Sequence, residues 1–258
     1  MVGPERLESV SLLSSPKGST LVSASVVIPT YNRVKSLMLT LKAILLQESL
    51  PREVVVVDDC SNDGTELEFR RLVGNHLPFR LVYLRQKRNC GPAAARNLGV
   101  VNASYDIVLF TDDDCEPEPQ WVGELVSFMR SSPHLAGVGG PVVSAERSRV
   151  GLFFDHHHLL DPKFVGPEDS PVYLVTANAA YRKHWLLRVG GFNEGFVRPG
   201  GEDPDLSFKV SAAGGMLGFA PRAIVRHHYQ TKFKPIVRMF WNYGYGGYHV
   251  ALVNTNHK

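Results

Sequence analysis

The stretch Leu109–Pro119, LFTDDDCEPEP, places three consecutive aspartates directly after an apolar run. Adjacent carboxylates repel one another, so Asp112, Asp113 and Asp114 require either water or a shared positive partner. In an extended segment alternate side chains share a face, which lets Asp112 and Asp114 point together while Asp113 points away. Two carboxylates placed in this way suit Mg²⁺ or Mn²⁺, and a solvated acidic turn before the next helix is the structural alternative.

The apolar run before the aspartates is the last of four predicted strands that alternate with predicted helices. Continuous apolar runs predict strands at residues 24–30, 53–59, 79–86 and 106–110. Apolar residues at helical spacing predict helices at residues 33–47, 66–73, 92–103 and 117–132. Buried strands that alternate with helices indicate an α/β fold with a mostly parallel sheet covered by helices on both faces.

Length and composition predict a globular, cytoplasmic protein. The 258 residues, 44% of them hydrophobic, suffice for one large α/β domain or two fused lobes. The net charge of +3 is too small to indicate a nucleic-acid partner, and none is expected. No window holds the roughly 20 apolar residues of a membrane span, and residues 1–24 lack a signal peptide's apolar centre. The three cysteines, Cys60, Cys90 and Cys115, form no CxxC pair, which favours reduced thiols.

Polar residues follow three of the four predicted strands at the points where the strands end. They are Thr30–Arg33, Asp58–Asp59 and Asp112–Asp114. Open parallel sheets bind ligands beyond the carboxyl ends of their strands, although loops are also polar without any ligand. IPTYNR follows the first strand in place of GxGxxG or GxxxxGK[ST], so neither a Rossmann dinucleotide site nor a phosphate loop is expected.

Six segments in a fixed order resemble the family 2 glycosyltransferases of the GT-A fold. The segments are SVVIPTYNR, EVVVVDDCSNDGT, NCGPAAARNLG, DIVLFTDDDCEPEPQWV, GGFNE and GGEDPDLSFKVSAAGG, and together they cover residues 24–228. The resemblance implies a GT-A type, Rossmann-like, mostly parallel sheet with helices on both faces and a fused acceptor-binding lobe. It also implies inverting transfer of a sugar from a nucleotide diphosphate sugar, with a UDP-sugar favoured, to an acceptor hydroxyl.

The same resemblance divides the chain into four parts. Residues 1–23 form an N-terminal tail, 24–115 a nucleotide-sugar-binding half, and 116–232 the acceptor-binding and catalytic half of the same domain. Residues 233–258 mix basic and aromatic side chains, which fits either a lid over the donor or an interfacial segment on a membrane. The glycines at 244, 246 and 247 favour a flexible loop over a regular helix there.

The resemblance assigns residues to the nucleotide sugar. Those assigned to it are Pro29, Thr30, Tyr31 and Arg33 around the base, Asp59 on the base, Gly91 and Arg96 near the diphosphate, Asp112 near the ribose, and Asp113 and Asn178. A carboxylate at position 59 could accept a hydrogen bond from uracil or from guanine. For Arg96 the alternative is an ion pair on a helix surface, and for Asn178 a buried side chain bonded to the backbone.

The metal site implied by the resemblance holds a divalent cation, Mn²⁺ or Mg²⁺, through the D-x-D motif and one histidine. Asp114 is the firmest expected ligand, and Asp112 and one histidine from AIVRHHYQ complete the set. Strand alternation allows only one of His227 and His228 to face inward, and the spacing from Val225 favours His227.

The resemblance also supplies a general base for the acceptor hydroxyl. It favours Asp203 as the base and Glu202 as a residue that orients the acceptor. Pro204 suits the first position of a helix, which would make Asp203 the N-cap of that helix. An N-terminal helix dipole lowers the pKa of a carboxylate, and this would weaken Asp203 as a base.

The acceptor and the cellular setting stay open at the level of the sequence. A saccharide, a glycoside or a lipid-linked sugar would each provide an acceptor hydroxyl, and the last would bring the protein to the cytoplasmic face of a membrane. Two functions of other classes are alternatives. A nucleotidyltransferase could also use paired carboxylates, but IPTYNR is a poor triphosphate loop; a catalytically silent nucleotide-sugar-binding module would not require an intact Asp114 and Asp203.

Overall fold

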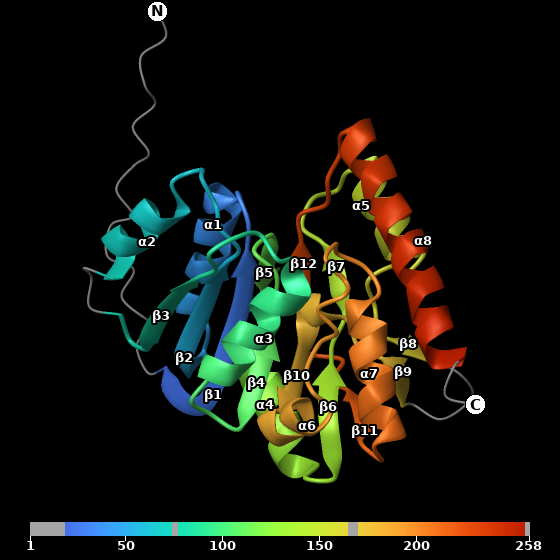
Figure 1. Ribbon diagram of the computed structural model, residues 1–258. Coiled ribbons are helices and arrows are strands. Elements are labelled where there is room, and N and C mark those ends of the chain that lie inside the picture. Colours follow the sequence, from blue (N-terminus) through green and yellow to red (C-terminus); the bar gives the residue numbers. More distant parts are fainter. Residues whose placement is uncertain (1–18, 74–76, 165–169, 256–258) are drawn as a thin grey trace, which may run out of the picture.

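The computed structural model describes residues 19–73, 77–164 and 170–255, and its centre is a seven-stranded sheet (Figure 1). The predicted N-terminal tail lies mostly outside the described residues. Across the sheet the order is β11-β6-β10-β4-β1-β2-β3. The strands are β1 (Thr20–Thr30), β2 (Ser49–Asp58), β3 (Arg80–Arg85), β4 (Ile107–Phe110), β6 (Leu135–Gly139), β10 (Ala179–Arg182) and β11 (Met216–Phe219).

Most neighbouring strands of this sheet are parallel, as predicted. β1 pairs in parallel with β2 and β4, β2 with β3, and β6 with β11, whereas β10 is antiparallel to both β4 and β6. Thr30 is in register with Asp58, so β1 and β2 end side by side. The two halves of the chain therefore share one sheet, and β10 joins them.

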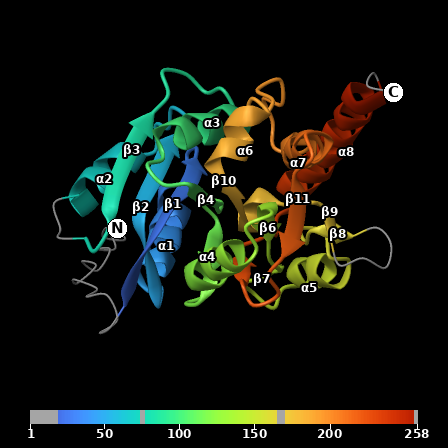
Figure 2. The same cartoon turned by 90° about the horizontal axis from the view of Figure 1, so that it is seen from below.

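Helices cover both faces of the sheet because successive side chains of each strand point to opposite sides. Val26 and Ile28 of β1 pack in a cluster with α1 (Val34–Leu45), α2 (Thr65–Val73) and α4 (Trp121–Ser131). Val27 packs instead with α3 (Pro92–Asn102), α6 (Lys183–Arg188) and α7 (Glu202–Ala212). Figure 2 shows α3, α6 and α7 on one side of the sheet and α1 and α4 on the other. The predicted α/β architecture is confirmed.

A second, three-stranded sheet changes one predicted boundary. It has the order β5-β12-β7, with β5 (Cys115–Pro117) between the acidic triplet and α4, β12 (Val225–His227) in its centre and β7 (Val142–Ser144) beyond it. The helix predicted to begin at residue 117 begins at Trp121, because Cys115–Pro117 pairs antiparallel with β12. This pairing sets His227 opposite Cys115, beside the triplet.

The last helix, α8 (Phe233–Thr255), was not expected from its glycines. The prediction of a flexible loop there is wrong, because the chain forms a continuous helix beside α7 and α5 (Figure 1). A Cβ atom on Gly246 would lie 2.0 Å from the carbonyl oxygen of Gly200, so the glycine lets two backbones touch. Tertiary packing thus offsets the cost of about 1 kcal/mol per helical glycine. None of the described helices is both long and apolar enough to cross a bilayer.

The remaining elements lie between β7 and α6 in the sequence. They are α5 (Arg149–His156), the two-stranded sheet of β8 (Lys163–Phe164) and β9 (Pro171–Tyr173), and the 3₁₀ turn η1 (Thr176–Asn178). Phe154 of α5 packs 6.0 Å from Phe240 of α8, between ring centroids, and so helps to seat that helix.

Candidate active site

Each aspartate of the acidic triplet is bound by a side chain from another part of the chain. Asp112 accepts a hydrogen bond of 2.8 Å from Arg96, and Asp113 accepts one of 2.7 Å from the hydroxyl of Thr30. The guanidinium of Arg33 reaches Asp113 at 3.1 Å and Asp114 at 2.5 Å. Burial and the neighbouring Asp114 raise the pKa of Asp113 to about 7. The solvated-turn alternative is therefore wrong, since Asp113 and Asp114 are buried and bonded.

Arg96 connects the triplet to the start of α7. Its side chain, on α3, is 5% exposed and binds Asp112 at 2.8 Å and Glu202 at 3.0 Å, while Asp203 lies 3.9 Å away. The alternative of a helix-surface ion pair is wrong, because this arginine is buried between three elements. The three carboxylates around it raise its pKa against the effect of burial, so the guanidinium stays charged.

Glu202 and Asp203 occupy the first turn of α7 but in different environments. The Glu202 carboxylate binds Arg96 through one oxygen and accepts a 2.6 Å hydrogen bond from the backbone of Gly200 through the other. Asp203 accepts hydrogen bonds from the backbone N–H of Thr176 at 3.0 Å and from its hydroxyl at 2.8 Å. Burial and the neighbouring Glu202 raise the pKa of Asp203 to about 7.

The structure corrects the predicted helix cap. Gly201, with a φ of 98°, is the N-cap of α7, so Asp203 lies one residue inside the helix and Pro204 follows it. Burial and repulsion from Glu202 raise the pKa of Asp203, which is opposite in direction to the lowering predicted from the helix dipole. Asp203 is thus a carboxylate that can take up a proton near neutral pH.

The residues predicted around the nucleotide base line the ends of β1 and β2. Pro29 and Thr30 are buried, whereas Tyr31 is exposed beside them. Asp59 is also buried and holds the loop before α3, since it accepts hydrogen bonds from the backbone N–H groups of Cys90 and Gly91 at 2.7 and 2.8 Å. Gly91 has a φ of 90°, and a Cβ there would lie 2.6 Å from the carbonyl oxygen of Val197, so only glycine fits this contact without strain.

Asn178, which was predicted to contact the nucleotide sugar, is bonded to protein groups outside the acidic triplet. Its side chain is fully buried. The amide oxygen accepts a hydrogen bond from the Trp121 indole at 2.7 Å, and the amide nitrogen donates to the carbonyl oxygens of Pro141 and Ala223 at 2.8 and 2.7 Å. These contacts match the alternative of a buried side chain bonded to the backbone. Through them Asn178 links η1 to the two sheets.

A group of possible metal-ligating atoms lies beside the triplet. Atoms of Asp114, Cys115 and His227 lie within 4.8 Å of one another, and Nε2 of His227 is 3.3 Å from Oδ1 of Asp114. Two ligands about 2.1 Å from an ion at right angles are about 3 Å apart, so this pair fits one divalent cation. The Nδ1 atom of His227 is buried without a hydrogen-bond partner in the described structure, whereas His228 binds Glu116 and Glu146.

The group differs from the expected ligand set in two residues, since it lacks Asp112 and includes Cys115, which was not an expected ligand. Asp112 is not in it, because its carboxylate is paired with Arg96. Cys115 is in it but is fully buried, and burial raises the pKa of its thiol well above the usual range. A neutral thiol is a poor ligand for Mg²⁺ or Mn²⁺, so Asp114 and His227 are the pair that fits such an ion.

Two residues near the carboxylates had no place in the sequence predictions. Thr176 holds Asp203 from η1, and Tyr243 approaches from α8, where its ring lies 3.1 Å from the position of a Cβ on Gly200. Burial and the charges of the nearby carboxylates, Asp112 among them, raise the pKa of Tyr243. The sequence signal for Thr176 was its position at the end of an apolar run, but nothing local connects Tyr243 with residues 112–203.

Comparisons with known proteins agree with this arrangement. Residues 25–188 match the family described as Glycosyl transferase family 2. The Pre-mycofactocin glycosyltransferase of Mycobacterium tuberculosis is 30% identical over 231 residues, which are 85% of this chain and 45% of that protein. The chondroitin synthase of Pasteurella multocida is 28% identical over 75% of this chain and 23% of its own length. This chain therefore spans less than half the length of either relative.

Solved structures show the same fold. A mannosyltransferase from Pyrobaculum calidifontis in complex with GDP-Man and Mn²⁺ matches with a TM-score of 0.64 at 25% identity, over 81% of this chain and 57% of that one. GalNAc-T7 with UDP, GalNAc and Mn²⁺ matches with a TM-score of 0.65 at 20% identity, over 81% of this chain and 44% of that one. The chain belongs to glycosyl transferase family 2 and has a GT-A fold.

Proposed function

We propose that the chain moves a sugar from a UDP-sugar to an acceptor hydroxyl with inversion, in a single displacement for which Asp203 is the general base. The observation that carries this proposal is the set of five carboxylates that face two guanidinium groups: Asp112, Asp113, Asp114, Glu202 and Asp203 against Arg33 and Arg96. The excess of negative charge is suited to a divalent cation and the diphosphate that it binds.

Asp203 suits the role of base better than Glu202. Both oxygens of Glu202 are bonded to protein groups and its side chain is 5% exposed, so it is held in place beside Arg96. The side chain of Asp203 is 16% exposed and its pKa is raised to about 7. A base of this pKa is ionised in part near neutral pH and still attracts the proton of a hydroxyl. Thr176 fixes the orientation of the carboxylate.

Asp114 and His227 would hold Mn²⁺ or Mg²⁺ beside the acidic triplet. When bound, such an ion offsets the negative charge that develops on the leaving diphosphate. Mn²⁺ is present in the complexes of GalNAc-T7 and of the mannosyltransferase, which supports the choice of that ion for the first experiments. Asp112 remains the carboxylate that we place near the ribose.

The donor pocket that we propose lies at the ends of β1 and β2. The exposed ring of Tyr31 provides a surface on which a nucleotide base can stack, and the buried Pro29 and Thr30 fix its position. Asp59 and Gly91 shape the loop on the other side of this pocket. A UDP-sugar is our first choice of donor, since related folds were solved with UDP and with UDP-GlcNAc as well as with GDP-Man. The acceptor hydroxyl belongs to a saccharide, a glycoside or a lipid-linked sugar.

The role of Asp203 is tested by the release of UDP from a panel of UDP-sugars with Mn²⁺. We expect Asp203→Asn to slow the release of UDP by about 10²- to 10⁴-fold, because general base catalysis contributes that much. Asp205→Asn is the matched control, since Asp205 lies on the same helix and pairs with Lys209 away from the cluster. Calorimetry should show unchanged binding of UDP in both variants. Full activity of Asp203→Asn would remove the base assignment.

A further inference from the structure

Helix α8 has two faces of opposite character. On its inner face Gly246 packs against Gly200, and Tyr243 lies near the carboxylates. The outer face leaves large side chains exposed at helical spacing: Val237 is 50% exposed, Trp241 66%, Tyr245 49% and Tyr248 62%. A row of large exposed side chains on one face of a helix is typical of a place where another molecule binds.

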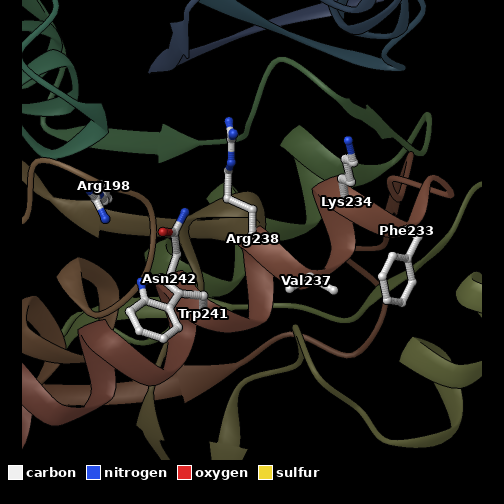
Figure 3. A pocket seen from close by; sticks show the side chains of 7 residues that line it. All are labelled: Arg198, Phe233, Lys234, Val237, Arg238, Trp241 and Asn242. Carbon is white, nitrogen blue, oxygen red and sulfur yellow. The ribbon is translucent and has the colours of Figure 1, made fainter.

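The charge of the outer face indicates which kind of molecule that is. Residues 233–255 contain no Asp or Glu. Arg198, Lys234 and Arg238 form no ion pair with any residue that the structure describes. In Figure 3 the side chains of Lys234 and Arg238 extend from α8 toward the side on which Arg198 lies, while the rings of Phe233 and Trp241 project to the other side. These residues line a cavity of about 680 Å³ that also includes Val237 and Asn242.

We propose that the outer face of α8 rests on an anionic membrane surface. Trp and Tyr rings have an apolar body and a polar tip, which places them at the boundary between lipid tails and water. Each nearby Lys or Arg adds about 1 kcal/mol of attraction to anionic headgroups. Since no described helix can cross a bilayer, α8 lies on the surface of the membrane rather than across it.

The membrane contact also restricts the class of acceptor, and this step rests on the proposed function. Because Gly246 touches the turn before Glu202 and Asp203, the lipid surface would lie about one helix diameter, roughly 10 Å, from the catalytic carboxylates. An acceptor hydroxyl that reaches Asp203 would then belong to a molecule anchored in that surface. The acceptor class that fits is a lipid-linked sugar rather than a free saccharide.

The test is co-sedimentation of the protein with phosphatidylcholine vesicles made with and without phosphatidylglycerol. We expect binding only to the vesicles that contain phosphatidylglycerol, and a loss of that binding at high salt. Lys234→Glu combined with Arg238→Glu should weaken it by at least about tenfold. The control is Arg52→Glu combined with Arg130→Glu, which changes the same charge at exposed residues of β2 and α4.

A second pair of variants tests the apolar contribution. Trp241→Ala combined with Tyr248→Ala should reduce vesicle binding, whereas Leu67→Ala combined with Leu187→Ala should not, although Leu67 and Leu187 are 56% and 55% exposed. The proposal is overturned if vesicles with and without phosphatidylglycerol bind equally, or if both pairs of variants behave alike. It is also overturned if the wild type is a dimer that the Trp241 and Tyr248 variant dissociates, because the face would then bind a second copy.

Binding of UDP with Mn²⁺, measured on the same proteins, separates this proposal from the proposed function. Intact nucleotide binding without vesicle binding contradicts the membrane contact alone. Vesicle binding without nucleotide binding contradicts the donor site alone.

Discussion

Arg96 is the side chain at which the two parts of the site meet. It binds Asp112 after β4 and Glu202 at the start of α7, and it is almost completely buried. A buried charge of this kind is stable only with its partners, and the partners need it equally, because each carboxylate would otherwise be buried without a counter-charge. Arg96 therefore fixes the positions of Asp112 and Glu202 and balances their charge.

Replacing Arg96 should cost far more stability than replacing an exposed arginine. We expect Arg96→Met to lower the free energy of unfolding by about 3–5 kcal/mol, since one partner of a buried ion pair is removed. Arg226→Met is the control, because Arg226 is 51% exposed in its pair with Glu118 and such pairs contribute about 0–1 kcal/mol. Urea denaturation measures both values. Similar losses in the two variants would contradict the structural role of Arg96.

If Asp203 is the proposed general base, its pKa gives the reaction a pH dependence of defined sign. Asp203 accepts a proton only when it is ionised, and burial and Glu202 raise its pKa to about 7. The rate of UDP release should therefore fall about tenfold for each pH unit below about 7 and level off above it. The pH profile of kcat/KM, recorded with saturating Mn²⁺, checks this expectation. A rate that stays constant from about pH 5 to about pH 8 would show that another group limits the reaction.

At the scale of elements, α8 shows how a contact distant in sequence determines a local structure. Three glycines predict a loop, yet the segment is helical because Gly246 lies against Gly200 and Phe240 packs near Phe154. Gly247 faces open space and takes no part in this contact. The two glycines thus have different roles although they are neighbours in the sequence.

Alanine substitutions at these two glycines should separate the contact from helix propensity. Gly246→Ala places a Cβ 2.0 Å from the Gly200 carbonyl oxygen and should destabilise the docking of α8 by about 1–3 kcal/mol. Gly247→Ala meets no atom and should stabilise the helix by up to about 1 kcal/mol. Hydrogen exchange of the α8 amides measures both effects. Unchanged protection in Gly246→Ala would contradict the close contact with the turn before α7.

At the scale of the whole molecule, the chain forms one sheet that two sequence halves share. The first four strands and the helices between them were predictable, because apolar runs, turn residues and prolines are local signals. β10, which runs antiparallel between β4 and β6, and the three-residue strands β5 and β7 carry too short a pattern to be recognised, whereas a strand that ends at the histidines of β12 was expected. The predicted start of α4 was wrong for this reason, since Pro117 belongs to β5 and the helix begins only at Trp121.

The candidate site was predictable to the extent that it depends on the ends of parallel strands. Such ends meet at one edge of a sheet, so Thr30, Asp59 and Asp114 could be placed together. The contacts that complete the site join residues far apart in the sequence, as in Arg33 with Asp114 and Thr176 with Asp203. No local pattern encodes these pairs, which explains why Thr176 and Tyr243 were missed.

The most direct test of the whole account is a calorimetric titration with UDP, GDP and dTDP, with and without Mn²⁺. We expect UDP to bind tightly only with Mn²⁺, and this binding to be lost in Asp114→Ala but kept in Asp106→Ala, which removes an exposed aspartate at the other end of β4. Nucleotide binding that does not depend on Mn²⁺, or that Asp114→Ala leaves intact, would contradict a metal-dependent donor site at the acidic triplet.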